Sequence, residues 1–180
     1  MRALLEDSAA ILVDIQERLV PAINNEKETI ENSKKFTEGL RLLGVPIFVT
    51  RQYPKGLGDI IPELKETLGE YTPYDKISFS IFGCDEIRKA LHLSGKKNLF
   101  IYGMETHICV EQSIMDLQKA GYQTYLVCDC VSSRKEQDHR IGMKRAKAEG
   151  AILTTKEAAL FELLKVAEGE AFKKISKLIK

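Results

Sequence analysis

The chain has 180 residues and a formal net charge of +1, because it carries 27 basic and 26 acidic side chains. This length suits one domain over residues 1–180 with a full hydrophobic core. The near balance of charge argues against a nucleic-acid partner and against binding to a membrane surface. No run approaches the ~18 consecutive apolar residues of a membrane span, so no membrane partner is expected.

The N-terminal segment and the cysteines indicate the cellular compartment in which the protein is expected. The first residues, MRALLEDSAAILVD, are too short and too acidic for a secretory signal, which predicts a cytoplasmic protein. No C-x-x-C pair occurs among the four cysteines, which are Cys84, Cys109, Cys128 and Cys130. Because a domain of this size needs no disulfide framework, reduced thiols are expected.

Apolar strand-like runs alternate with longer helical patterns along the chain. The elements expected in chain order are a strand at 9–13, a helix at 27–43, a strand at 46–50, a helix at 85–93, a strand at 97–102, a helix at 106–120, a strand at 124–128, a helix at 136–149, a strand at 151–154 and a helix from 168 onward. The strands lack polar alternation, as is typical of parallel strands covered on both faces. This pattern predicts an α/β fold, a three-layer α/β/α sandwich around a mostly parallel, doubly wound, Rossmann-like sheet.

The segment from residue 51 to 80 breaks the alternation, because it is rich in proline and glycine. We expect a partly irregular excursion with a short strand around Lys76. Long structured segments of this kind in compact domains are more often functional than not. This one is expected to reach the edge of the sheet where ligands bind.

Ligand sites in doubly wound sheets lie beyond the carboxyl ends of the strands. This rule selects Asp14, Arg51, the segment 103–109 and Asp129 as candidates. Among them, Cys109 lies about one turn into a predicted helix, where the helix dipole favours an anion. We therefore expect a lowered thiol pKa at this position.

A nucleophilic thiol needs a base and a charge partner. Thr106 is expected to cap the helix, so that free N–H groups of its first turn could stabilise an oxyanion. Asp14 could act as the general base, and Lys76 could favour the thiolate and keep Asp14 ionised. Each residue also has a plainer interpretation, namely a buried structural cysteine, a turn aspartate and a solvated lysine.

Three segments in order resemble the isochorismatase-like cysteine hydrolase superfamily. They are ILVDIQ at 11–16, YDKISFS at 74–80 and GMETHICV at 103–110. The runs RQYPKGLG at 51–58, CVSSR at 130–134 and FKKISKLIK at 172–180 are similar to its isochorismatase domain-containing group, whose substrates are mostly unassigned.

The resemblance implies specific roles. The catalytic residues would be Asp14, Lys76 and Cys109, and the oxyanion hole would consist of the backbone N–H groups of Glu105 and Cys109. A non-proline cis peptide bond is expected between Met104 and Glu105. The implied reaction cleaves the C–N bond of a small amide through a thioester on Cys109.

The resemblance also implies what the site lacks. Metal-dependent members carry an Asp and His cluster in the loop that corresponds to residues 51–64, where this chain has no histidine. His92, His107 and His139 lack ligand spacing, so no metal and no other cofactor are expected. The superfamily is commonly oligomeric, which implies a homo-oligomer. The retained cysteine favours acyl chemistry over vinyl-ether cleavage.

Four residues are predicted to bind substrate, and they are Gln16, Tyr53, Phe79 and Thr106. A turn role for Gln16 and ordinary packing of the two aromatic rings are the alternatives.

Further positions are expected to be structural. Cys128 and Cys130 are expected to form a buried pair at a strand end. Arg134 and Asp138 are expected in a surface turn at a helix start. The apolar stripe of the last helix is expected to pack on its own sheet, with an oligomer contact as the alternative.

Two hypotheses from different classes remain. The first is the metal-independent amidohydrolase just described. The second is a non-catalytic or redox-sensing protein of the same fold, which binds a metabolite or uses a low-pKa Cys109 as an oxidation target. The sequence favours the hydrolase, because a sensor has no need of Asp14 and Lys76 together.

Overall fold

The computed structural model describes residues 2–180. Its centre is a six-stranded sheet with the order β3-β2-β1-β4-β5-β6, in which each neighbouring pair is parallel. The strands are β1 (Ser8–Val13), β2 (Ile47–Gln52), β3 (Pro73–Lys76), β4 (Asn98–Met104), β5 (Gln123–Ser132) and β6 (Ile152–Thr154). This arrangement confirms the predicted doubly wound α/β fold.

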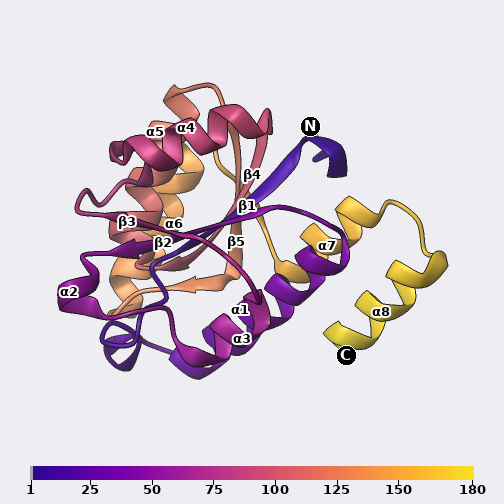
Figure 1. Cartoon of the computed structure of the whole chain (residues 1–180), viewed down its shortest axis with the longest axis horizontal. Helices are drawn as coiled ribbons and strands as arrows, with labels where there is room; N and C mark the ends of the chain where they lie inside the picture. The colour runs from indigo at the N-terminus through magenta and orange to yellow at the C-terminus, as the bar shows by residue number, and fades with distance from the viewer. Residues whose placement is uncertain (1) are drawn as a thin grey trace.

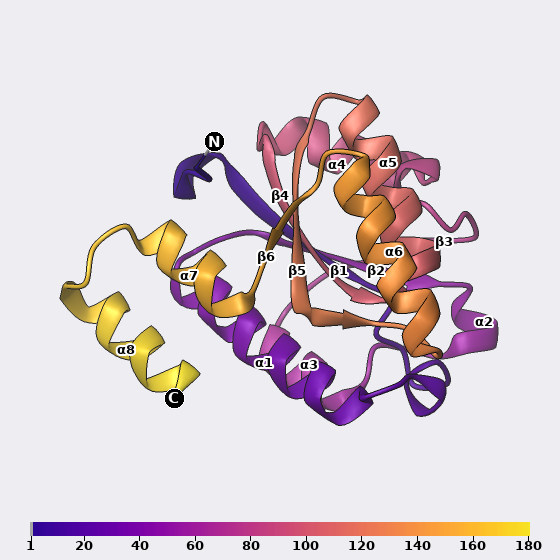
Figure 2. The same ribbon diagram turned by 180° about the vertical axis from the view of Figure 1, so that it is seen from behind.

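Helices cover both faces of the sheet. They are α1 (Glu26–Leu42), α2 (Pro54–Leu57), α3 (Pro62–Leu68), α4 (Asp85–Ser94), α5 (Glu111–Lys119), α6 (Glu136–Ala148), α7 (Lys156–Leu164) and α8 (Gly169–Ile179). Helices α4, α5 and α6 lie on one face, and α1, α3 and α7 lie on the other, with α8 outside α1 and α7 (Figures 1 and 2). No helix within residues 2–180 is long and apolar enough to span a bilayer.

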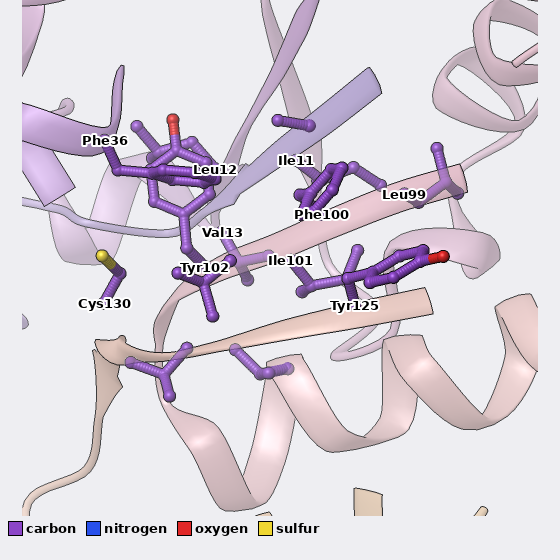
Figure 3. Packing of buried hydrophobic residues seen from close by; sticks show 14 of the residues in the cluster. Ile11, Leu12, Val13, Phe36, Leu99, Phe100, Ile101, Tyr102, Tyr125 and Cys130 are labelled. Carbon is purple, nitrogen blue, oxygen red and sulfur yellow. The ribbon is translucent and has the colours of Figure 1, made fainter. Parts of the chain in front are cut away.

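The core lies on both sides of the two central strands (Figure 3). Every residue of β1 and β4 is buried, which explains why their sequences carry no polar alternation. On one face, Phe36 of α1 meets Tyr102 edge-on with ring centroids 5.1 Å apart. The Tyr102 hydroxyl, which is deep in the core, shares a 2.9 Å hydrogen bond with Thr37. The core therefore satisfies this buried hydroxyl while holding α1 against the sheet.

The structure differs from the sequence prediction in several places. Helix α7 is not among the expected elements, and α2 and α3 lie inside the segment predicted to be partly irregular. Strand β5 runs to Ser132, so Cys128 and Cys130 lie within the strand rather than at its end, and only Cys130 of the two is buried. The extension arises at an irregularity in the β4–β5 pairing.

The last helix also packs differently from the prediction. Helix α8 packs mainly on α1 and α7, which separate it from the sheet (Figures 1 and 2). Its buried residue is Ile175, and its Phe172 ring lies 6.1 Å from the Phe161 ring of α7. The sheet face below is already covered by α1 and α7, so the apolar stripe of α8 packs on that second layer.

Two helical glycines permit close packing of very different kinds. A Cβ atom on Gly142 of α6 would lie 2.8 Å from Cα and 2.9 Å from N of His107. A Cβ atom on Gly39 of α1 would lie 2.6 Å from the end of the Leu160 side chain. Backbone atoms cannot move aside as a leucine methyl group can, so Gly142 is the stricter requirement.

We expect Gly142→Ala to lower the free energy of unfolding by about 1–3 kcal/mol, despite a helix-propensity gain of ~1 kcal/mol. Gly39→Ala has the same propensity gain, and its clash is relieved by a rotamer change of Leu160. Urea denaturation of both variants measures the difference. A smaller loss for Gly142→Ala than for Gly39→Ala would contradict the packing described.

Candidate active site

The strand order brings three distant segments to the carboxyl edge of the sheet. Asp14 follows β1, Lys76 ends β3, and Cys109 lies in the turn after β4. β1 and β4 are adjacent and mark the point where the strand order reverses, which is where doubly wound sheets bind ligands. β2 lies between β1 and β3, so its last residue, Gln52, lies between Asp14 and Lys76 in the strand order.

Asp14 and Lys76 form a buried ion pair. The Lys76 Nζ atom lies 2.6 Å from Asp14 Oδ2, and Lys76 and Asp14 are 3% and 0% exposed. Asp14 adopts a left-handed backbone conformation (φ 52°), which aspartate tolerates better than most residues. Thr50 of β2 donates its hydroxyl to Asp14 Oδ1 at 2.7 Å. Each carboxylate oxygen has a further lone pair, so Asp14 retains capacity to accept a proton.

The Lys76 ammonium has three acceptors within 3.0 Å, and the Ser78 carbonyl lies further away at 3.4 Å. Besides Asp14, it donates to Gln52 Oε1 at 2.7 Å and to the Phe79 carbonyl at 3.0 Å. An ammonium has three protons, so this environment satisfies the buried cation. The sequence prediction missed Gln52, because nothing in the run RQYPKGLG at 51–58 separates this glutamine from the exposed polar residues that follow it.

Cys109 lies in a single π-helical turn, Thr106–Val110, which precedes α5 and which we call the nucleophile turn. π-helical turns recur at functional sites. The Cys109 carbonyl accepts a 2.5 Å hydrogen bond from Ser113 of α5, and the same Ser113 oxygen accepts from Ile81 N at 3.0 Å. Ser113 thus connects the nucleophile turn to the segment that follows Lys76.

The expected low thiol pKa is wrong for this structure. Cys109 is 6% exposed, and its burial raises the pKa of the thiol to about 12. The Asp14 carboxylate raises the pKa further, and the Lys76 ammonium opposes that effect. Burial disfavours the thiolate more strongly than helix position favours it. The structure therefore holds Cys109 as a thiol beside a carboxylate.

The nucleophile turn is not capped by Thr106, which corrects a second expectation. Glu105 is the residue before the turn, and no side chain caps it. The Thr106 hydroxyl instead makes a 2.9 Å hydrogen bond with His139 Nδ1 of α6. His107 Nδ1 bonds to Ser133 Oγ at 2.9 Å. Sequence spacing gave no signal for these contacts, because α6 begins only after the whole of α5 and β5 along the chain.

The Met104–Glu105 peptide bond is cis, as the family resemblance implied. The Glu105 side chain accepts hydrogen bonds from the backbone N (3.1 Å) and the Nε atom (3.0 Å) of Arg134. Arg134 is exposed in a bend just before α6, as expected, and it also anchors the segment before the nucleophile turn. The oxyanion-hole roles of the Glu105 and Cys109 N–H groups stay predictions.

The other predicted substrate-binding residues lie around the same edge. The Gln16 carboxamide bonds to the backbone N (2.7 Å) and O (3.0 Å) of Gln52 and to the Gly58 carbonyl (2.8 Å). Gln16 is fully buried, so a surface turn is excluded, and its amide supports the end of β2. Tyr53 and Phe79 are 50% and 52% exposed, so both rings are accessible. Substrate contact by these residues stays a prediction.

Two further candidates at this edge form separate ion pairs. Arg51 bonds to Asp75 at 2.7 Å and to Asp59 at 2.9 Å, which raises the pKa of its guanidinium. Asp129 bonds to Lys156 Nζ at 3.0 Å. Neither pair includes Asp14 or Cys109.

Within residues 2–180, no group of three or more His, Cys, Asp or Glu side chains is arranged to hold a metal ion. The polar groups at the carboxyl edge are instead bonded to one another. Cys109, Asp14 and Lys76 together offer a thiol, a carboxylate and a cation, which are groups that acyl-transfer chemistry can use.

We expect Lys76→Met to lower the free energy of unfolding by about 3–5 kcal/mol, because it leaves the Asp14 carboxylate buried without a cation. The double variant Asp14→Asn/Lys76→Met should recover part of that loss. Lys65→Met, which removes an exposed partner of Asp59, should change stability far less. Chemical denaturation of these variants and the wild type gives the comparison, and equal losses at Lys76 and Lys65 would contradict a buried ion pair.

Comparison with known proteins shows the family. The Isochorismatase domain family matches residues 8–158. Isochorismatase domain-containing protein 1 of Danio rerio is 36% identical over 168 residues, which cover 93% of this chain but only 59% of that protein. Isochorismatase domain-containing protein 2A of Mus musculus is 34% identical over 180 residues, which cover 99% of this chain and 85% of that protein.

Solved structures agree with this result. A structure described as the MAR1 ribonuclease from Caenorhabditis elegans has a TM-score of 0.93 and 37% identity, and the match covers 99% of this chain and 92% of that chain. The superfamily resemblance inferred from three short segments is therefore confirmed. The family match across most of the residues and the identity to these relatives show that this chain belongs to the isochorismatase family.

Proposed function

We propose that the protein is a metal-independent cysteine hydrolase that cleaves the C–N bond of a small amide. The observation that carries this proposal is the convergence of Cys109 with the buried Asp14–Lys76 pair. Family membership supports a hydrolase, and the retained thiol favours acyl transfer within that class. The proposed substrate is a small molecule, since the three side chains are almost completely buried.

The first half of the reaction forms a thioester. Asp14 takes the Cys109 proton as sulfur attacks the amide carbonyl, whose electrons move to oxygen. The N–H groups of Glu105 and Cys109 stabilise this oxyanion. The C–N bond then breaks, and Asp14 returns the proton to the departing nitrogen, which leaves as ammonia or an amine.

The second half releases the acid. Asp14 takes a proton from water as the water oxygen attacks the thioester carbonyl. The C–S bond breaks, and the proton returns to the Cys109 sulfur. Throughout, the Lys76 ammonium balances the negative charge that moves between Asp14, the sulfur and the oxyanion.

The raised thiol pKa distinguishes this proposal from the redox-sensing alternative. Oxidation-sensing cysteines have a low pKa and are accessible, whereas Cys109 is buried and its pKa is raised. A thiol of high pKa beside a carboxylate suits a base-assisted attack, in which the proton leaves as the new bond forms.

Cleavage of RNA is a second candidate, because the C. elegans structure is described as a ribonuclease. The near-neutral charge of this chain argues against it, since binding of the phosphate backbone relies on clustered Lys and Arg.

Assembly into a homo-oligomer is also part of the proposal.

We expect Cys109→Ala to abolish amide hydrolysis, because the thioester of the proposed mechanism forms on the Cys109 sulfur. Cys128→Ala, which removes a half-buried thiol from β5, should retain activity. Ammonia release from a panel of small amides measures both, with a thermal melt to show that each variant is folded. Full activity of Cys109→Ala would reject the mechanism, and cleavage of RNA with no amide turnover would favour the second candidate.

The pH dependence of alkylation tests the state of the thiol. Because the pKa of Cys109 is raised to about 12, the thiolate fraction should rise about tenfold per pH unit below that value. Iodoacetamide labelling of Cys109, followed by peptide mass, should therefore climb from about pH 7 to pH 10 without a plateau. A plateau below about pH 9 would show a thiolate that is already formed in the free protein.

A further inference from the structure

Gln52 is the only side chain of β2 that reaches the Lys76 ammonium in the described residues 2–180. Its Oε1 atom accepts from Lys76 at 2.7 Å, and its Nε2 atom donates to the Ile77 carbonyl at 2.8 Å. This pairing fixes the orientation of the carboxamide, because an ammonium can only donate and a carbonyl can only accept. Gln52 thus holds both Lys76 and the backbone that follows it.

The position of Gln52 is itself held firmly. Gln16 accepts from the Gln52 backbone N at 2.7 Å and donates to its carbonyl at 3.0 Å. Gln52 is also paired in register with Lys76 across β2 and β3. The Gln16 carboxamide therefore holds the backbone of Gln52, and the Gln52 carboxamide in turn holds the Lys76 ammonium. A glutamate side chain has nearly the same size as glutamine and would also fit at this position.

The neutrality of Gln52 matters because Lys76 already has one anionic partner. The charged groups that act on Cys109 are Asp14 after β1 and Lys76 at the end of β3. Beside the nucleophile turn, Glu105 is paired with Arg134, and His139 of α6 bonds to Thr106. A second carboxylate beside Lys76 would neutralise the positive charge that stabilises a Cys109 thiolate or an oxyanion.

We infer that Gln52 is a positioning residue, which fixes the Lys76 ammonium between its acceptors and, by being neutral, leaves the Lys76 charge to balance negative charge at Cys109. This inference rests on the proposed function for its catalytic meaning. The geometry on which it depends involves only groups of this chain. It can therefore be tested on the free protein.

The decisive variant is Gln52→Glu, which is nearly isosteric. When the introduced carboxyl group is protonated, it could keep both hydrogen bonds of the glutamine, since its carbonyl oxygen accepts and its hydroxyl donates. When it is ionised, it would add a negative charge beside Lys76 and would face the Ile77 carbonyl without a donor. The effect of this substitution should consequently grow as the pH rises.

The measurement is the rate constant for modification of Cys109 by methyl methanethiosulfonate, resolved by peptide mass, from about pH 6 to pH 9. The ratio of wild-type to Gln52→Glu rates should rise with pH to about tenfold or more. Gln118→Glu makes the same charge change at the opposite end of the sheet, and its ratio should stay near one. A Gln52→Glu ratio that does not change with pH overturns the inference.

A second variant covers the case in which Gln52→Glu does not fold. Gln52→Met is neutral and removes the acceptor, so the Lys76 ammonium should exchange its protons with water at least about tenfold faster in ¹⁵N-resolved NMR spectra. An unchanged exchange rate overturns the positioning role. Neither measurement uses an amide, so failure of the amide assay and failure of this inference are separate results.

Discussion

The buried ion pair between Lys76 and Asp14 is the constraint around which the site is built. A buried cation is stable beside its anion only when its other protons also find acceptors. The chain meets that demand with one acceptor from each neighbouring segment: the Asp14 carboxylate, the Gln52 carboxamide and the Phe79 carbonyl. The strand order, in which β2 lies between β1 and β3, brings these groups together.

Burial also decides how the thiol can react. Removing Cys109 from water stabilises the neutral S–H form, and the helix N-terminus does not reverse this. The cost of forming a free thiolate is avoided if the proton passes directly to Asp14 during attack. The same exclusion of water strengthens the interaction of Lys76 with any negative charge that develops. The burial of Asp14, Lys76 and Cys109 thus disfavours a preformed thiolate and strengthens the electrostatic field around the sulfur.

The fold class and the positions of Asp14 and Cys109 could be predicted from the sequence for physical reasons. Unbroken apolar runs identified the central strands, and the rule on carboxyl ends then placed Asp14 and Cys109 on one edge. The predictions that were wrong concern contacts between segments that are far apart in the chain. Thr106 bonds to His139 because α6 lies against the nucleophile turn, at the close contact that Gly142 allows. The thiol pKa could not be predicted, since it depends on burial.

The place of β3 in the sheet has a consequence for the lifetime of the assembled site. β3 is a four-residue strand at the margin of the sheet, paired on one side only, and it supplies the Lys76 cation. The fully buried strands β1 and β4, by contrast, lead directly to Asp14 and to the nucleophile turn. Short edge strands open at a lower free energy than central ones. Brief detachment of β3 from β2 would remove the Lys76 ammonium from Asp14 while the core stays folded. The fraction of time for which the site is assembled would then depend on how often β3 opens.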